Sequence, residues 1–311
     1  MSNFDIAETL RSICSGSTLK LLLTACLMLA SGAHAQDESQ LARIQALNLE
    51  VLKVGRVTTY YGPGDRERAE QLATLCEEAA AFFERELGGL TFDFHLAALA
   101  PKDWFSPYGN DLPYGIPWGS VAERLMVVPA SSSEGALIQG YDRSYDQRMI
   151  EFVTIHEFGH IANKQYYHPT STYEEFPVPW FEELVASYFA YAFFRSTDPQ
   201  WTESARKDWT ASVEGYTPRV LSLDWSFMRS LPGPELAQTY GWYQLVLNLR
   251  VVEIYAEHGL AFLRRLKETL PVDTPDNWTT ESLLDRLERI APGFQGWADK
   301  FKRGTNRPGN N

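Results

Sequence analysis

The stretch TIHEFGHIAN, residues 154–163, contains two histidines four residues apart and a glutamate directly after the first. On a helix, residues i and i+4 lie on one face, so His156 and His160 can direct both imidazoles at one metal ion. Glu157 is rotated by about 100° from His156, so it can border the metal and accept a proton from a water there. The stretch therefore predicts a zinc site with its general base, in the H-E-x-x-H pattern.

The surroundings of the motif favour a metal site over the alternative that the two histidines are ordinary residues of a hydrophobic core. The expected helix over residues 146–167 is mostly apolar on both sides of the motif. A buried helix excludes two histidines and a glutamate unless these side chains have polar partners. A bound zinc supplies such partners, so the motif is interpreted as a metal site rather than as satisfied core histidines.

Zinc in a catalytic site takes three protein ligands and leaves the fourth position open, so a third ligand has to be found. The candidates are His168, Glu182 and Glu183. His168 precedes a proline among loop residues, which favours a solvent-facing histidine. The direction of Glu183 on its expected helix, residues 179–195, is shared by the small residues Ala186, Ser187 and Ala190. Small residues let two helices approach closely, so Glu183 is the preferred ligand, and Glu182 is either a neighbouring contact or a helix-capping acid.

HEFGH followed by PWFEELVASY resembles the gluzincin metallopeptidases, and in particular the peptidase MA-like domain proteins. In that group a second helix with a Trp-x-x-Glu-[Gly/Leu]-x-Ala pattern carries the third ligand, and Trp180, Glu183 and Ala186 match it. The resemblance covers roughly residues 56–259, although its specific motifs are only the two ligand helices. It implies a zincin-like fold with one Zn²⁺ per chain, held by His156, His160 and Glu183.

The sequence departs from related patterns at several points. The spacing between His160 and Glu183 is a little longer than in the best-known gluzincins. The metzincin pattern places a glycine and a histidine where this chain has Asn163 and Tyr166. The Gly-x-Met-Glu-Asn element of gluzincin aminopeptidases has no equivalent, and YGIPWGS at residues 114–120 is the nearest glycine-rich stretch. Recognition of a free amine is therefore unsupported.

A peptidase also needs a donor for the oxyanion that forms at the attacked carbonyl. The stretch LAQTYGWYQLVLNL resembles the later helix of peptidase MA-like proteins, which often opens with a tyrosine. Tyr240 is the first choice and Tyr243 the second, although tyrosines on helix faces commonly serve packing alone. The expected strand over residues 124–130 is a candidate edge for pairing with an extended substrate, and Tyr114 and Trp118 are candidates to line the same cleft.

Hydrophobic periodicity predicts an α+β fold, and the resemblance implies that this fold is of the zincin-like kind. A small N-terminal α/β lobe with a mixed sheet, about residues 50–145, is followed by a mostly helical lobe, residues 146–303, with the motif helix at the junction. Residues 36–303 are expected to form one domain, and residues 304–311 a disordered tail. The expected strands are 56–62, 91–99 and 124–130, with a structured loop over 100–120. The expected helices are 64–87, 146–167, 179–195, 235–257, 260–270 and 281–290, with an irregular stretch before the fourth.

Residues 1–35 have the pattern of an export signal. Lys20 precedes the apolar run LLLTACLMLA, and SGAHA ends in an A-x-A cleavage pattern before Gln36. A lipoprotein signal ending at Cys26 is the alternative, which the continuation of the apolar run disfavours. After cleavage Cys76 alone remains, so the mature chain is expected to lack an internal disulfide. An exported protein, periplasmic or secreted and without a stable membrane insertion, is expected.

The overall composition limits which partners and functions are compatible with the chain. The chain has 311 residues, of which 44% are hydrophobic, and a net charge of −12, which argues against a nucleic-acid partner. The function expected is that of an exported zinc-dependent metallopeptidase that hydrolyses peptide or protein substrates. A non-catalytic zincin-like module that binds peptide or a partner protein is the alternative, and a non-peptide amide or ester is a third possible substrate.

Overall fold

The structure is a computed structural model and describes residues 39–105, 114, 117–130, 147–167, 177–231, 233–270 and 278–302. In this part of the chain a five-stranded sheet has the order β1-β2-β3-β5-β4. The strands are β1 (Glu50–Val54), β2 (Val57–Tyr61), β3 (Phe94–Leu99), β4 (Trp118–Ser120) and β5 (Leu125–Pro129). The pairs β2/β3 and β3/β5 are parallel, whereas β1/β2 and β4/β5 are antiparallel, so the sheet is mixed.

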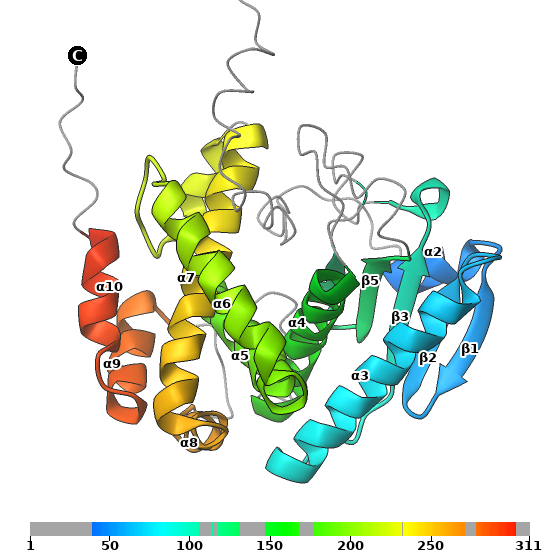
Figure 1. Cartoon of the computed structure of the whole chain (residues 1–311), viewed down its shortest axis with the longest axis horizontal. Coiled ribbons are helices and arrows are strands. Elements are labelled where there is room, and N and C mark those ends of the chain that lie inside the picture. Colours follow the sequence, from blue (N-terminus) through cyan, green and yellow to red (C-terminus); the bar gives the residue numbers. More distant parts are fainter. Residues whose placement is uncertain are drawn as a thin grey trace, which may run out of the picture.

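Helices make up most of the remaining described chain. Figure 1 shows the longer helices on one side of the sheet, with α4 between the sheet and the later helices. The short helix α2 packs on the opposite face. The α-helices are α2 (Gln40–Ala46), α3 (Arg66–Leu87), α4 (Gln147–Tyr167), α5 (Pro179–Thr197), α6 (Pro199–Gly215), α7 (Gly233–His258), α8 (Ala261–Thr269), α9 (Thr280–Ile290) and α10 (Phe294–Lys302). Two short 3-10 helices, η1 (Pro101–Asp103) and η2 (Trp225–Ser230), lie between them. The predicted α+β class, a small mixed sheet followed by a mostly helical lobe, is confirmed.

The two faces of the sheet belong to two separate cores. Alternate residues of β3 and β5, such as Phe94 and Met126, face the large core shared with α3 and the helical lobe. Their neighbours, such as Ala97 and Val127, face a small core on the opposite side, which α2 closes with Ile44. Both central strands are therefore buried on both faces, which explains why their sequences are nearly continuous apolar runs.

Several elements were not predicted. They are α2, β1, β4, α6 and α10. The three-residue strand β4 lies where a loop was expected, because so short a strand shows no periodicity. The helix α6 lies within the stretch expected to be irregular; Asp198 caps it by accepting a hydrogen bond from the Trp201 amide, and Pro199 occupies its first position. A helix start was thus encoded there by an Asp-Pro pair.

The strand over 124–130 was expected at an edge, and this was wrong. It corresponds to β5, which lies between β3 and β4. β5 uses its backbone groups on both sides, so β4 is the outermost strand at this end of the sheet. A peptide that adds a strand here would meet β4.

The helix α4 is buried on nearly its whole circumference, because it lies between the sheet and α5. Its residues from Met149 to Ala162 are all buried. Its contact with α5 is the most extensive between any two described helices. Gly159 makes this contact close: a Cβ at that position would lie 2.6 Å from the Ala186 carbonyl oxygen and 2.8 Å from the Ala186 Cα. The two helix backbones therefore touch at Gly159 and Ala186.

Aromatic rings join α3 to these two helices. The Phe83 ring on α3 lies 4.7 Å from the Phe189 ring on α5 and 6.4 Å from the Phe158 ring on α4, between centroids. Phe82 makes an edge contact with Phe193. Each such pair contributes about 0.5–1.5 kcal/mol beyond the burial of its area. The side of α5 that carries Phe189 and Phe193 is thus fixed against α3.

None of the described helices is long and apolar enough to cross a bilayer.

We expect Gly159→Ala to destabilise the protein. The added methyl group would press on the backbone of Ala186, so α4 and α5 must separate, which costs about 1–3 kcal/mol or more. The control is Gly296→Ala on α10, where an added Cβ has no atom within 4 Å. That change should be neutral or stabilise by about 1 kcal/mol. Chemical denaturation of both variants measures the difference, and equal stability of Gly159→Ala and the unmodified protein would contradict a requirement for close helix contact.

Candidate metal centre

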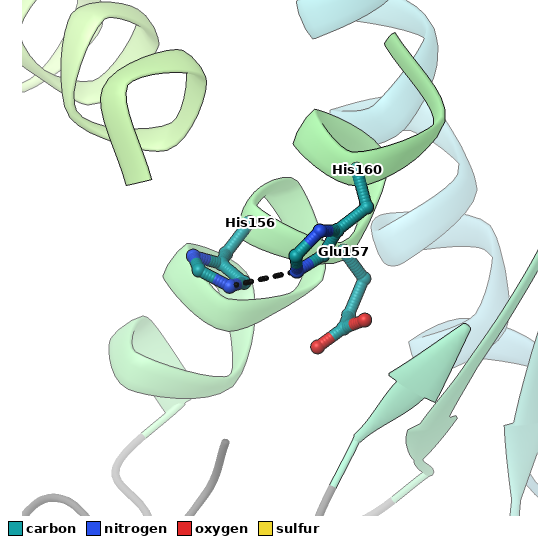
Figure 2. Close-up of side chains that lie close together, drawn as sticks. All are labelled: His156, Glu157 and His160. Carbon is teal, nitrogen blue, oxygen red and sulfur yellow. Dashed lines mark hydrogen bonds between the residues drawn. The ribbon is translucent and has the colours of Figure 1, made fainter. Parts of the chain in front are cut away.

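The two motif histidines meet on one side of α4. The Nε2 atoms of His156 and His160 are 3.2 Å apart, and the rings lie edge to face with their centroids 4.9 Å apart. Figure 2 shows both rings converging while the Glu157 side chain extends past them towards the sheet. One ligand atom from each of these three residues lies within 4.8 Å of the others. All three side chains are buried, so the helix carries a buried polar cluster in an apolar setting.

The helix α5 brings Glu183 to the same point. Glu183 Oε2 is 2.9 Å from His156 Nε2 and 3.6 Å from His160 Nε2. A single oxygen of Glu183 therefore lies close to both imidazole nitrogens.

These three atoms fit the spacing that a zinc ion needs. Zn–N and Zn–O bonds of about 2.0–2.1 Å at tetrahedral angles place neighbouring ligand atoms about 3.4 Å apart. The observed separations are 3.2 Å between His156 Nε2 and His160 Nε2, and 2.9 and 3.6 Å from these nitrogens to Glu183 Oε2. Two neutral imidazoles and a carboxylate are also a donor set that Zn²⁺ prefers. The residues present therefore fit a single bound zinc.

An oxygen atom lies near the other ring nitrogen of each histidine. Ser187 Oγ is within hydrogen-bond distance of His156 Nδ1, at 3.2 Å. Glu182 Oε1 is 3.5 Å from His160 Nδ1, an ion-pair distance without a hydrogen bond. When Nε2 is the metal-binding nitrogen, Nδ1 carries the proton and can donate it to such an oxygen, which fixes the tautomer and the ring direction. Glu182 thus lies beside a candidate ligand, and Ser187 has a role that the sequence analysis did not assign.

The helix α7 supplies two more polar side chains. The Tyr240 hydroxyl donates a hydrogen bond of 2.9 Å to Glu183 Oε1, and Gln244 Nε2 donates one of 2.9 Å to Glu183 Oε2. Gln244 also donates to the Tyr240 hydroxyl oxygen. The sequence predicted Tyr240 at the site but not Gln244, although its position four residues later on the same helix face was visible.

Burial raises the pKa of the Glu157 carboxyl above its ordinary value, although the nearby His160 and His156 act in the opposite direction. The raised pKa results mainly from loss of hydration, because the side chain has no exposed surface. Such a shift moves a carboxylate towards the range in which it can accept and return a proton near neutral pH.

The pKa of Glu183 moves the opposite way. Burial alone would raise it, but the adjacent His160 and His156 outweigh burial and hold the pKa well below its usual range. Burial likewise lowers the pKa of His160, but the carboxylates of Glu183 and Glu182 outweigh it and raise this pKa well above normal. The site therefore stabilises positive charge next to an ionised Glu183, which is the electrostatic condition for binding a cation.

The edge strand β4 passes directly beside Glu157. A Cβ on Gly119 would lie 3.4 Å from Glu157 Oε2 and 3.1 Å from the Leu125 carbonyl oxygen. Trp118 points to the other face of the sheet, where it is buried in the small core, and Tyr114 packs against Trp104, which borders that core. The expectation that Trp118 lines the site is therefore wrong, because side chains alternate along a strand and Gly119 takes the inward position.

The remaining candidates lie elsewhere. The Tyr243 hydroxyl accepts a hydrogen bond from the Ser222 amide at 2.6 Å and lies 3.3 Å from the Val220 carbonyl oxygen. It thus stabilises the loop before η2 and is not brought to Glu183. His168 lies outside the described residues, as do Cys26 and Gln36.

Comparison with known proteins found similarity to solved structures. No protein-family model matches the chain, and no curated protein does. One similar structure is a variant of the M1 zinc metallopeptidase of Deinococcus radiodurans bound to a Tyr-Ser-Ala substrate, at 15% identity and a TM-score of 0.45. Another is a variant of a two-domain M1 zinc metallopeptidase bound to L-tryptophan, at 16% identity and a TM-score of 0.44. Each match covers 84% of this chain and 52% of the other, so the chain spans about half the length of these enzymes. Scores this low transfer no site or activity, so residue roles depend on the geometry of this chain.

We expect Glu183→Ala to lose most bound zinc, because two histidines without a third ligand hold zinc poorly. The matched control is the adjacent Glu182→Ala, which removes only the oxygen beside His160 Nδ1 and should lower zinc affinity by about 10- to 100-fold at most. Metal content after dialysis, measured by elemental analysis, decides between them. Zinc retained in Glu183→Ala and lost in Glu182→Ala would reverse the assignment.

Proposed function

We propose that the protein is a zinc-dependent metallopeptidase whose zinc is held by His156, His160 and Glu183. The observation that carries the proposal is the convergence of three ligand atoms, 2.9–3.6 Å apart, next to a buried glutamate of raised pKa. A purely structural zinc site is closed by a fourth protein ligand. The described residues supply three such ligands and a base at the border, which is the composition of a catalytic site.

Glu157 is the proposed general base. Bound zinc supplies Lewis-acid polarisation of the substrate carbonyl and of the attacking water. Glu157 takes one proton from that water as its oxygen attacks the carbonyl carbon, and it returns the proton to the nitrogen of the leaving amine. The C–N bond then breaks, and a carboxylic acid and an amine leave. The burial that raises the pKa of Glu157 helps the carboxylate to accept the proton and to hold it until the leaving amine takes it up.

Tyr240 is the proposed donor to the carbonyl oxygen as that oxygen becomes negative. Its ring is buried against Trp225, with centroids 5.5 Å apart, which limits the motion of the side chain. In the structure its hydroxyl donates a hydrogen bond to Glu183 Oε1. To donate to a substrate oxygen, the hydroxyl has to give up this bond to Glu183. A donor of this kind contributes about 10²- to 10³-fold to the rate.

Glu157→Gln should retain zinc and lose hydrolysis. The amide has almost the size of the carboxylate but cannot accept the proton. Cleavage of a library of quenched fluorescent peptides measures activity, and metal analysis verifies that zinc remains. Full activity in this variant would refute the mechanism. An unmodified protein that binds both zinc and peptide but cleaves none would favour the non-catalytic binding module instead.

Tyr240→Phe should lower kcat by about 10²- to 10³-fold while most of the zinc is retained. Tyr243→Phe is the matched control, because it removes a hydroxyl from the same helix that bonds only to backbone at Ser222 and Val220. We expect normal kcat and a loss of about 1 kcal/mol of stability in the control. Equal rates in Tyr240→Phe and the unmodified enzyme would remove Tyr240 from the mechanism.

We further propose that the protein is exported and that the mature chain begins at Gln36, four residues before α2 starts at Gln40. The support is the sequence pattern of residues 1–35 alone. Mass spectrometry of protein purified from the native cell envelope should find Gln36 as the first residue. A lipid on Cys26 would overturn this proposal and place the domain at a membrane surface.

A further inference from the structure

Both carboxylate oxygens of Glu183 are held by the single helix α7. Oε1 accepts a hydrogen bond from the Tyr240 hydroxyl, and Oε2 accepts one from Gln244 Nε2. Gln244 is 2% exposed and Tyr240 is 5% exposed. Buried side chains such as these have little access to water as a replacement partner, so the loss of either donor would leave Glu183 less well satisfied.

The hydrogen atoms available fix the orientation of Gln244. Its amide nitrogen carries two hydrogens, one directed to Glu183 Oε2 and the other to the Tyr240 oxygen. The single hydroxyl hydrogen of Tyr240 is then left for Glu183 Oε1. The reversed amide would place the Gln244 carbonyl oxygen against the Glu183 carboxylate, oxygen against oxygen. The three side chains therefore form a closed ring with every hydrogen used.

This ring limits how Glu183 can meet a metal. A carboxylate offers about four lone-pair sites. In Glu183 one site on Oε1 is taken by Tyr240, and one on Oε2 by Gln244. The oxygen that also faces the imidazoles is Oε2, at 2.9 Å from His156 Nε2. The Tyr240 and Gln244 donors thus hold the carboxylate in the orientation that presents Oε2 to the imidazoles.

We propose that Gln244 is a positioning residue that holds Glu183 with Oε2 directed at the two imidazoles and thereby sets the affinity for zinc. This inference rests on the proposed zinc site. Partners of this kind commonly change metal affinity by about 10- to 100-fold.

The test compares two conservative changes on the same helix face. Gln244→Met keeps the length of the side chain and removes both donors. Asn248→Leu is the matched control one turn later: Asn248 is also buried, and its Oδ1 has no hydrogen-bond partner among the described residues. Zinc affinity is measured on the metal-free full chain by competition with a chelator, and folding is verified by denaturation. We expect about 10- to 100-fold weaker zinc binding in Gln244→Met and unchanged binding in Asn248→Leu.

A second variant keeps the proposal testable if Gln244→Met does not fold. Gln244→Asn retains the amide but withdraws it by one methylene, and it should weaken zinc binding to a similar extent. The absorption spectrum of the Co²⁺-loaded chain should change in the Gln244 variants and not in Asn248→Leu. Unchanged zinc affinity in the folded Gln244 variants would overturn the inference while the zinc site stands, and an equal loss in Asn248→Leu would also overturn it. Failure of the unmodified chain to bind zinc would instead refute the proposed function.

Discussion

The contact between the backbones of α4 and α5 at Gly159 and Ala186 is the constraint on which the rest of the site depends. A side chain as small as a methyl group at position 159 would meet the Ala186 carbonyl oxygen at 2.6 Å. Because the helices touch there, a glutamate side chain three residues before Ala186 reaches His156 and His160. Wider separation would leave both histidines and Glu183 buried without one another, and an isolated buried charge costs several kcal/mol. The glycine inside the motif is therefore a packing requirement of the metal centre.

Buried charge explains why so many polar groups surround Glu183. Its carboxylate has two imidazoles on one side and the Tyr240 and Gln244 donors on the other. These contacts replace the hydration that burial removes, and the two imidazoles hold the pKa of Glu183 well below its usual range. Glu157 lies on the same helix as the histidines but receives less compensation, so its pKa rises. Two glutamates in one cluster are thus divided by environment into a permanent anion and a group that can carry a proton.

The sequence predicted the class of the fold, and it predicted which side chains lie together where the residue type itself limits the structure. The four-residue spacing of His156 and His160 places them on one helix face, and the small residues after Glu183 indicated the side of α5 that approaches α4. Gln244 was missed, because its position one turn after Tyr240 places it on the same helix face but does not indicate which side chain it contacts. The strand β4 was missed for a different reason. Its inward position is Gly119, and a residue without a side chain contributes nothing to periodicity, although it is what allows the strand to lie beside Glu157.

The residues of the candidate site come from three helices, and this has a consequence for the order in which the site forms. The two histidines come together as soon as α4 forms, because only local helix contacts are involved. Glu183 joins them only when α5 docks, and it gains both of its remaining partners only when α7, more than fifty residues later in the chain, packs against α5. The candidate metal site is therefore complete only once the helical lobe has folded around it. Its assembly is a late event that depends on the whole tertiary fold rather than on any single helix.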